Sequence, residues 1–87
     1  MPRVFIPPHV RRLVDGQKQI EVEGSTVEKL VSNLDAQYPG VREVLCLDGA
    51  LKPGLAVAVD GSMSNRGLHQ SVKQESEVHF LPAVGGG

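Results

Sequence analysis

A single long amphipathic helix limits what this chain can fold into. Its apolar stripe consists of residues at i, i+3, i+4 and i+7, namely Val27, Leu30, Val31 and Leu34, and Tyr38 extends it. Ser25 and Glu28 predict a capping box at its start, and Pro39-Gly40 predicts its end. One long helix can cover only one face of a sheet. We therefore expect the other face to stay partly open, as a place where a partner binds.

Strands are predicted on both sides of this helix. Residues 3–7 form a short strand that Pro7-Pro8 ends, and residues 19–23 alternate between apolar and polar after the turn signal Asp15-Gly16. These two segments predict a hairpin. Further strands are predicted at 55–59, inside the sheet because it is apolar on both faces, and at 77–81. Residues 41–47 predict one or two helical turns, and 62–72 allow a short edge strand. The fold class is α+β.

Length and composition exclude several classes of protein. The 87 residues are enough for one domain, which we place at 1–82, followed by a flexible tail at 83–87. The net charge of -1 gives no reason to expect nucleic acid or membrane binding, and the longest apolar run, 55–59, is too short to span a bilayer. A single cysteine and the lack of a secretory leader lead us to expect a cytoplasmic protein.

No side chains predict catalysis or metal binding. The three histidines His9, His69 and His79 are scattered, without the spacing of a ligand set. Cys46 lies between two leucines and is interpreted as a buried small hydrophobe. The pair Arg11-Arg12 is interpreted as a solvated strand end or loop. We expect no enzyme activity, no metal and no bound cofactor.

The last residues of the chain carry the clearest functional pattern. After Leu81-Pro82 the sequence continues with Ala83, Val84, Gly85, Gly86 and Gly87. A terminal glycine offers a carboxylate without a neighbouring Cβ, so it fits a narrow channel in another protein. Five extended residues span up to roughly 16–18 Å, enough to reach a buried nucleotide from a docked domain. Activation of the carboxylate by adenylation would then allow a sulfur nucleophile to form a thiocarboxylate.

The whole chain resembles the MoaD/ThiS family of sulfur carriers, which have a ubiquitin-like β-grasp fold. The segments that carry the resemblance are 4–7, 24–27, 30–40, 57–61 and, most specifically, 77–87. The stretch from Ile6 to Lys18 looks closest to the CysO-like carriers of cysteine synthesis. The family usually has Ala where Gly85 stands, and an Asp-Gly-Asp turn where this chain has Gln74-Glu75-Ser76. The resemblance implies a mixed sheet of four to five strands, one main helix across one face and an extended glycine tail.

The resemblance also implies a mechanism and a set of partners. An E1-like enzyme uses ATP to adenylate Gly87, and sulfur transfer gives the thiocarboxylate. Val84, Gly85 and Gly86 present this group to partner active sites. In the CysO-like branch the sulfur acceptor is an activated serine on a PLP-dependent cysteine synthase, and a metalloprotease releases the cysteine. The family's apolar residue before the tail's proline, here Leu81, typically belongs to the docking surface.

Strand parity places other residues beside Leu81. Val78 and Phe80 share one face of the last strand and are expected to pack beneath the helix, so His79 and Leu81 point to the open face. Phe5 has the outward parity of the first strand. We therefore predict a docking patch of Leu81, Phe5 and His79.

Three other interpretations stay open from the sequence alone. The chain could be a ubiquitin-like modifier that is conjugated to lysines, the small subunit of molybdopterin synthase, or a binding module with a frayed glycine end. The biosynthetic product that receives the sulfur is left open as well, and neighbouring genes would be the most informative observation.

Overall fold

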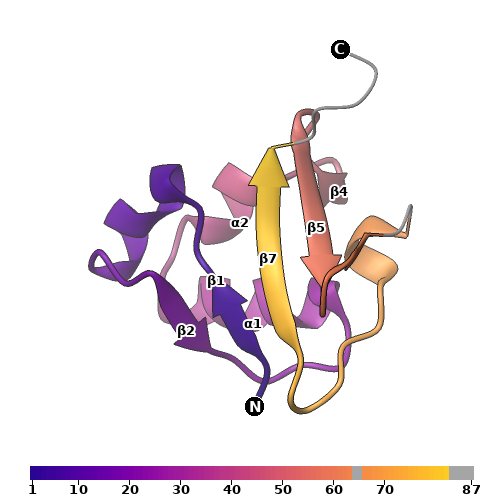
Figure 1. Ribbon diagram of the computed structural model, residues 1–87. Helices are drawn as coiled ribbons and strands as arrows, with labels where there is room; N and C mark the ends of the chain where they lie inside the picture. Colours follow the sequence, from indigo (N-terminus) through magenta and orange to yellow (C-terminus); the bar gives the residue numbers. More distant parts are fainter. Residues whose placement is uncertain (64–65, 83–87) are drawn as a thin grey trace.

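The last strand, β7 (Glu77–Pro82), lies in the interior of a five-stranded mixed sheet of order β2-β1-β7-β5-β6 (Figure 1). The computed structural model describes residues 1–63 and 66–82. β1 (Arg3–Phe5) runs parallel to β7 and antiparallel to β2 (Gln19–Glu21). β5 (Leu55–Val59) is antiparallel to β7 and to the short edge strand β6 (Ser62–Met63). The predicted four to five strands, the initial hairpin pairing and the interior position of 55–59 are confirmed.

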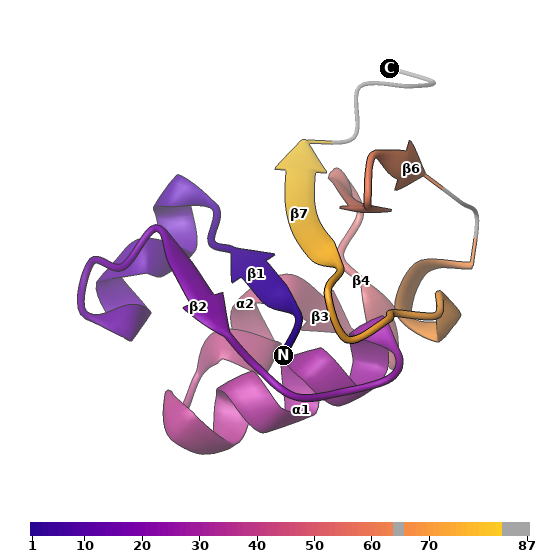
Figure 2. The same ribbon diagram turned by 60° about the horizontal axis from the view of Figure 1, so that its bottom comes forward.

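The core lies between this sheet and α1 (Val27–Gln37), which crosses one face of it (Figure 2). The four residues of the predicted stripe are buried to 1% exposure or less, and Tyr38 is partly buried against the core. From the sheet, the buried side chains that belong to this core include Val4, Val57, Val78 and Phe80. The helical period of the stripe and the alternation along β7 therefore predicted the two surfaces that meet.

The start of α1 differs from the predicted capping box. Thr26, not Ser25, is the N-cap: its backbone is extended and its side-chain oxygen accepts a hydrogen bond from the Lys29 amide at 3.2 Å. The backbone of Ser25 is used elsewhere, because its carbonyl accepts from the Val72 amide at 2.9 Å. Pairing with the segment before β7 keeps the chain extended through Thr26, so the helix begins one residue later than local sequence predicts.

The connection between β1 and β2 also differs from the prediction. The turn signal is correct, since Asp15 and Gly16 have φ of 55° and 74°. Between Pro7-Pro8 and this turn, however, residues Pro8–Val14 form a 3₁₀ helix, η1, that buries Val10 and Val14. The missed signal was Pro8 itself, because proline suits the first turn of a helix.

Smaller elements complete the fold. The predicted helical turns are α2 (Val41–Leu45), and a second 3₁₀ helix, η2, is Gly67–His69. Two short strands that sequence reasoning missed, β3 (Cys46–Leu47) and β4 (Ala50–Leu51), pair around the predicted Asp48-Gly49 turn.

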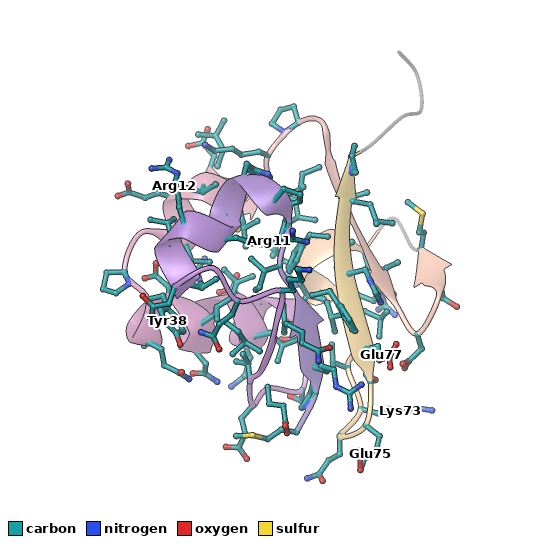
Figure 3. The ribbon with its side chains drawn as sticks, turned by 60° about the vertical axis from the view of Figure 1, so that its left-hand side comes forward. Arg11, Arg12, Tyr38, Lys73, Glu75 and Glu77 are labelled. Atoms are coloured by element: carbon teal, nitrogen blue, oxygen red, sulfur yellow. The ribbon has the colours of Figure 1, made fainter. Side chains whose placement is uncertain are left out.

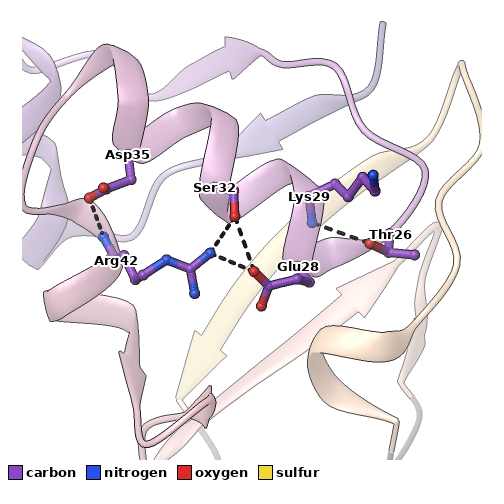
Figure 4. A network of polar contacts seen from close by, with 6 residues as sticks. All are labelled: Thr26, Glu28, Lys29, Ser32, Asp35 and Arg42. Carbon is purple, nitrogen blue, oxygen red and sulfur yellow. Dashed lines mark hydrogen bonds and ion pairs between the residues drawn. The ribbon is translucent and has the colours of Figure 1, made fainter.

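Polar contacts hold α1 against α2 (Figure 4). Arg42 Nη2 donates to Glu28 Oε1 at 2.5 Å and also contacts the Ser32 hydroxyl. Asp35 Oδ1 accepts from the amides of Gly40 and Arg42 at 3.2 and 3.0 Å. The hydrogen bond from Arg42 is the main reason that the pKa of Glu28 is lowered from its ordinary value. Glu28 thus joins two helices instead of closing a capping box.

Candidate functional site

The open face of the sheet brings two of the predicted docking residues into contact. Phe5 and His79 are neighbours in the parallel register of β1 and β7, and their rings stack with centroids 4.1 Å apart and planes 7° apart. Leu81 lies two residues further along β7, opposite Ala56 of β5, and is half-buried. Phe5, His79 and Leu81 therefore share the face opposite the helix. Their role in docking stays a prediction.

This face continues across the sheet as a partly apolar surface. Ala58, buried at 6% exposure, lies beside His79 in the register of β5 and β7, and Met63 of β6 lies beside Ala58. Met63 is 62% exposed, one of the most exposed large apolar side chains among the described residues. Exposed apolar side chains gathered on one face are typical of a surface that contacts another protein.

The tip of β7 projects beyond β1 (Figure 1). The register of β1 with β7 ends at the pair Phe5 and His79, whereas β5 pairs with β7 as far as Pro82. The Arg3 amide donates to the Ser76 carbonyl, so residues 3, 5 and 7 direct their backbone toward β7. Pro7 is the next residue in this series, and it has no N–H to donate. The ladder stops there for a chemical reason, and β7 carries the chain on toward residue 83.

The base of β7 is fixed by a buried serine and a carboxylate. The Ser76 hydroxyl donates to Asp60 Oδ2 at 2.8 Å and accepts from the Lys73 amide at 2.9 Å, and Ser76 is 2% exposed. Asp60 Oδ1 accepts from the Glu77 amide at 2.9 Å. The pKa of the Asp60 carboxyl is lowered mainly by the hydrogen bond from the Glu77 amide, and also by the one from the Ser76 hydroxyl. The segment with Gln74-Glu75-Ser76 therefore forms an ordered turn of its own at the position of the family's Asp-Gly-Asp.

The two adjacent arginines have different environments. Arg11 is half-buried, and its Nε donates to the Ile6 carbonyl at 3.0 Å. Figure 3 shows Arg11 directed toward the sheet and Arg12 directed away from it. The interpretation of the pair as a solvated strand end or loop is therefore wrong for Arg11, because the unpredicted helix η1 turns it inward.

Other residues named from the sequence are separate from this face. His9 lies in η1 and His69 in η2, and the described residues contain no group of three or more His, Cys, Asp or Glu side chains placed to hold a metal ion. Cys46 is buried at 8% exposure, and burial raises the pKa of its thiol. No helix in the described part of the chain is long and apolar enough to cross a membrane.

The tail residues Val84, Gly85, Gly86 and Gly87 lie outside the described residues. Comparison of the sequence with known families does include them, because a profile of the ThiS family matches residues 4–87. The chain belongs to the ThiS family. The match covers all but the first three residues, and it agrees with the resemblance found in the strands, helix and glycine end.

Similar proteins agree with the CysO-like branch of the family. The chain is 32% identical to "Sulfur carrier protein CysO" of Mycobacterium bovis and of Mycobacterium tuberculosis, covering 97% of this chain and 96% of each relative. A chain in the crystal structure of the Amycolatopsis orientalis BexX/CysO complex superposes with a TM-score of 0.88 at 29% identity, with full coverage of both chains. The solution structure of small archaeal modifier protein 1 of Methanosarcina acetivorans has a TM-score of 0.78 at 22% identity and covers 99% of this chain and 95% of that one. That last likeness concerns the fold alone, which is the ubiquitin-like β-grasp.

Proposed function

We propose that this ThiS-family protein is a sulfur carrier that acts through the carboxylate of Gly87 and is a cosubstrate of other enzymes, not a catalyst. The observation that carries the proposal is the family match, which includes the terminal glycines. Two further findings support it. The CysO relatives are sulfur carriers by name and match along almost their whole length. The interior strand β7 ends at Pro82, so the folded domain extends up to the start of the tail.

The chemistry proposed for Gly87 takes two steps. A carboxylate oxygen attacks the α-phosphorus of ATP on an E1-like enzyme, which forms the acyl-adenylate and releases pyrophosphate. A sulfur nucleophile then attacks the acyl carbon and displaces AMP, so the carboxylate becomes a thiocarboxylate. A glycine suits both steps, since no Cβ crowds the acyl carbon. The carrier itself binds no cofactor in this scheme, and ATP belongs to the activating enzyme.

The thiocarboxylate would then give its sulfur to a biosynthetic partner. The CysO-like relationship favours an activated serine on a PLP-dependent cysteine synthase as acceptor, with a metalloprotease that releases the product. The BexX/CysO complex supports docking of a carrier of this kind on a separate protein. Docking through the face that bears Leu81, Phe5 and His79 would place the tail at the partner's active site.

The experiment that tests the proposal changes the end of the tail. Gly87→Ala and a one-residue extension should both suppress adenylation, the first by adding a Cβ and the second by moving the carboxylate by roughly 3.3–3.6 Å. The measurement is ATP–pyrophosphate exchange with the cognate E1-like enzyme. Gly85→Ala is the matched control, because family members usually have Ala there, and it should keep the wild-type rate. Wild-type exchange with either altered terminus would refute the proposal.

A mass measurement distinguishes a carrier from a modifier. After incubation with the E1-like enzyme, ATP and a sulfide source, the intact protein should gain the mass of one exchange of oxygen for sulfur. A protein linked to lysines of other chains, with no such species, would instead identify a modifier.

A further inference from the structure

A groove lies beside the tip of β7, where β1 leaves the sheet. Its volume is about 470 Å³, and its apolar lining includes Phe5, Ile6, Pro7, Pro8 and Phe80. The groove exists because the β1 ladder stops at Phe5 and the chain turns into η1, leaving one side of the β7 tip without a strand. It therefore adjoins the Phe5–His79 stack and reaches Phe80, two residues before β7 ends at Pro82.

The charged side chains that line the groove are cationic. Arg11 and Lys18 line it, and none of the described residues that line it carries a carboxylate. Among the described residues neither cation has an ion-pair partner. The carboxylate of nearby Glu77 pairs instead with Arg3, at 3.4 Å from Nη1, and lies 3.9 Å from His79 Nε2. The groove thus combines an apolar lining with two positive charges that form no ion pair with other described residues.

A backbone contact orients one of the two cations. Arg11 is oriented by its Nε hydrogen bond to the Ile6 carbonyl, which leaves its terminal amino groups for another acceptor. Lys18 is exposed, and its carbonyl accepts from the Ile6 amide at 2.8 Å, so both residues contact the backbone of Ile6. Both residues line the groove, so a carboxylate that entered it would be attracted by each.

From these contacts we infer that the groove binds an extended segment of the partner protein that contains both acidic and apolar residues. Its apolar side chains would pack against the apolar lining, and its carboxylates would face Arg11 and Lys18. This inference rests on the proposed function, because a carrier has to dock before its tail can deliver a carboxylate. On the unpaired side of the β7 tip, Pro82 offers no N–H to an added strand, and Pro7 offers none from the opposite side. Recognition therefore depends on side chains and charge, not on addition of a strand to the sheet.

Lys18 is the residue to change, because replacing Arg11 would also remove its bond to the Ile6 carbonyl. The probe is a short acetylated and amidated peptide, Glu-Leu-Asp-Leu-Glu, titrated into isotope-labelled full chain while amide chemical shifts are followed. Its matched partner is Gln-Leu-Asn-Leu-Gln. Lys73→Glu is the control variant for Lys18→Glu, because it changes the net charge by the same amount. Lys73 is exposed and lies at the opposite end of β7 (Figure 3).

We expect the acidic peptide to shift amides around Phe5, Lys18 and His79, and to bind more weakly as salt rises. Lys18→Glu should raise the dissociation constant at least about fivefold, and Lys73→Glu should change it far less. Equal binding of the amide peptide, or an equal loss in both variants, would overturn the inference. Two other results would also overturn it. The same shifts on raising the protein concentration alone would identify a second copy as the occupant, and the same shifts on deleting residues 83–87 would identify the tail. Because the titration uses no ATP and no activating enzyme, its failure is separate from a failure of Gly87 adenylation.

Discussion

The two ends of β7 are held in different ways. At the base, Ser76 and Glu77 are fixed by hydrogen bonds to Asp60, and Arg3 of β1 lies alongside. At the tip, β1 is gone, β5 alone pairs with Leu81 and Pro82, and an apolar groove with two cations occupies the vacated side. One strand thus has an end that anchors the fold and an end that presents a surface and a tail. Stability and presentation can therefore be changed separately along it.

The largest effect is expected from the one side chain that anchors the tip to the core. Phe80 is 6% exposed and faces inward between the helix and the sheet. Phe80→Ala should lower the free energy of unfolding by about 3–5 kcal/mol, a large part of the stability of a small domain. Urea unfolding followed by circular dichroism measures this. A loss below about 1 kcal/mol would mean that the tip does not depend on its inner side chain.

Substitution of the neighbouring residue, Leu81, should affect binding and not stability. Leu81→Asp is expected to leave the fold intact and to weaken binding to the E1-like enzyme at least about tenfold, since burial of one such side chain contributes roughly 1.5–3 kcal/mol. Binding is measured by calorimetry with the purified enzyme. Leu47→Asp is the control, because Leu47 is 54% exposed on β3, outside the five-stranded sheet. Unfolding of the Leu81 variant, or unchanged binding, would show that the docking patch is misplaced.

The contribution of Asp60 to holding the base of β7 can be tested by measuring stability as a function of pH. The folded-state pKa of Asp60 lies below its ordinary value of 3.8 because its carboxylate accepts from the Glu77 amide and the Ser76 hydroxyl. Its stabilisation is therefore fully present above the unfolded-state pKa and is lost as the pH falls through the folded-state value.

The wild type should accordingly be more stable than Asp60→Asn at neutral pH, and the difference should shrink below about pH 4. Urea unfolding of both proteins across this range measures the difference. Asp48→Asn controls for the loss of a charge at a left-handed turn position, since φ is 52° at Asp48 and 51° at Asp60. A difference that does not change with pH would mean that the carboxylate does not hold the base.

The smallest effect is expected from removal of the tail. A chain that ends after Ala83 should melt only slightly below the full chain, because the removed glycines and Val84 offer little apolar area to bury. Thermal unfolding followed by circular dichroism measures this. Collapse of the fold would show that the tail packs on the domain and is not presented by it.

The sequence by itself determined the elements whose periodicity is long or strict. The stripe of α1 and the alternation along β7 predicted which side chains are buried, because a helix or strand of regular geometry turns every similarly spaced residue to the same side. It also determined the family, through the order of short segments and the glycine end. The role of Gly87 itself stays a prediction.

Only the tertiary structure decided the features that depend on distant partners. The N-cap moved to Thr26 because residues 25–27 pair with the segment around Val72, far along the chain. The groove formed because β1 meets β7 and then leaves it at a proline, after which η1 turns Arg11 inward. No local pattern encodes such contacts, since the energy of a backbone pair, or of a charge beside an apolar surface, depends on the fold that places the two partners together.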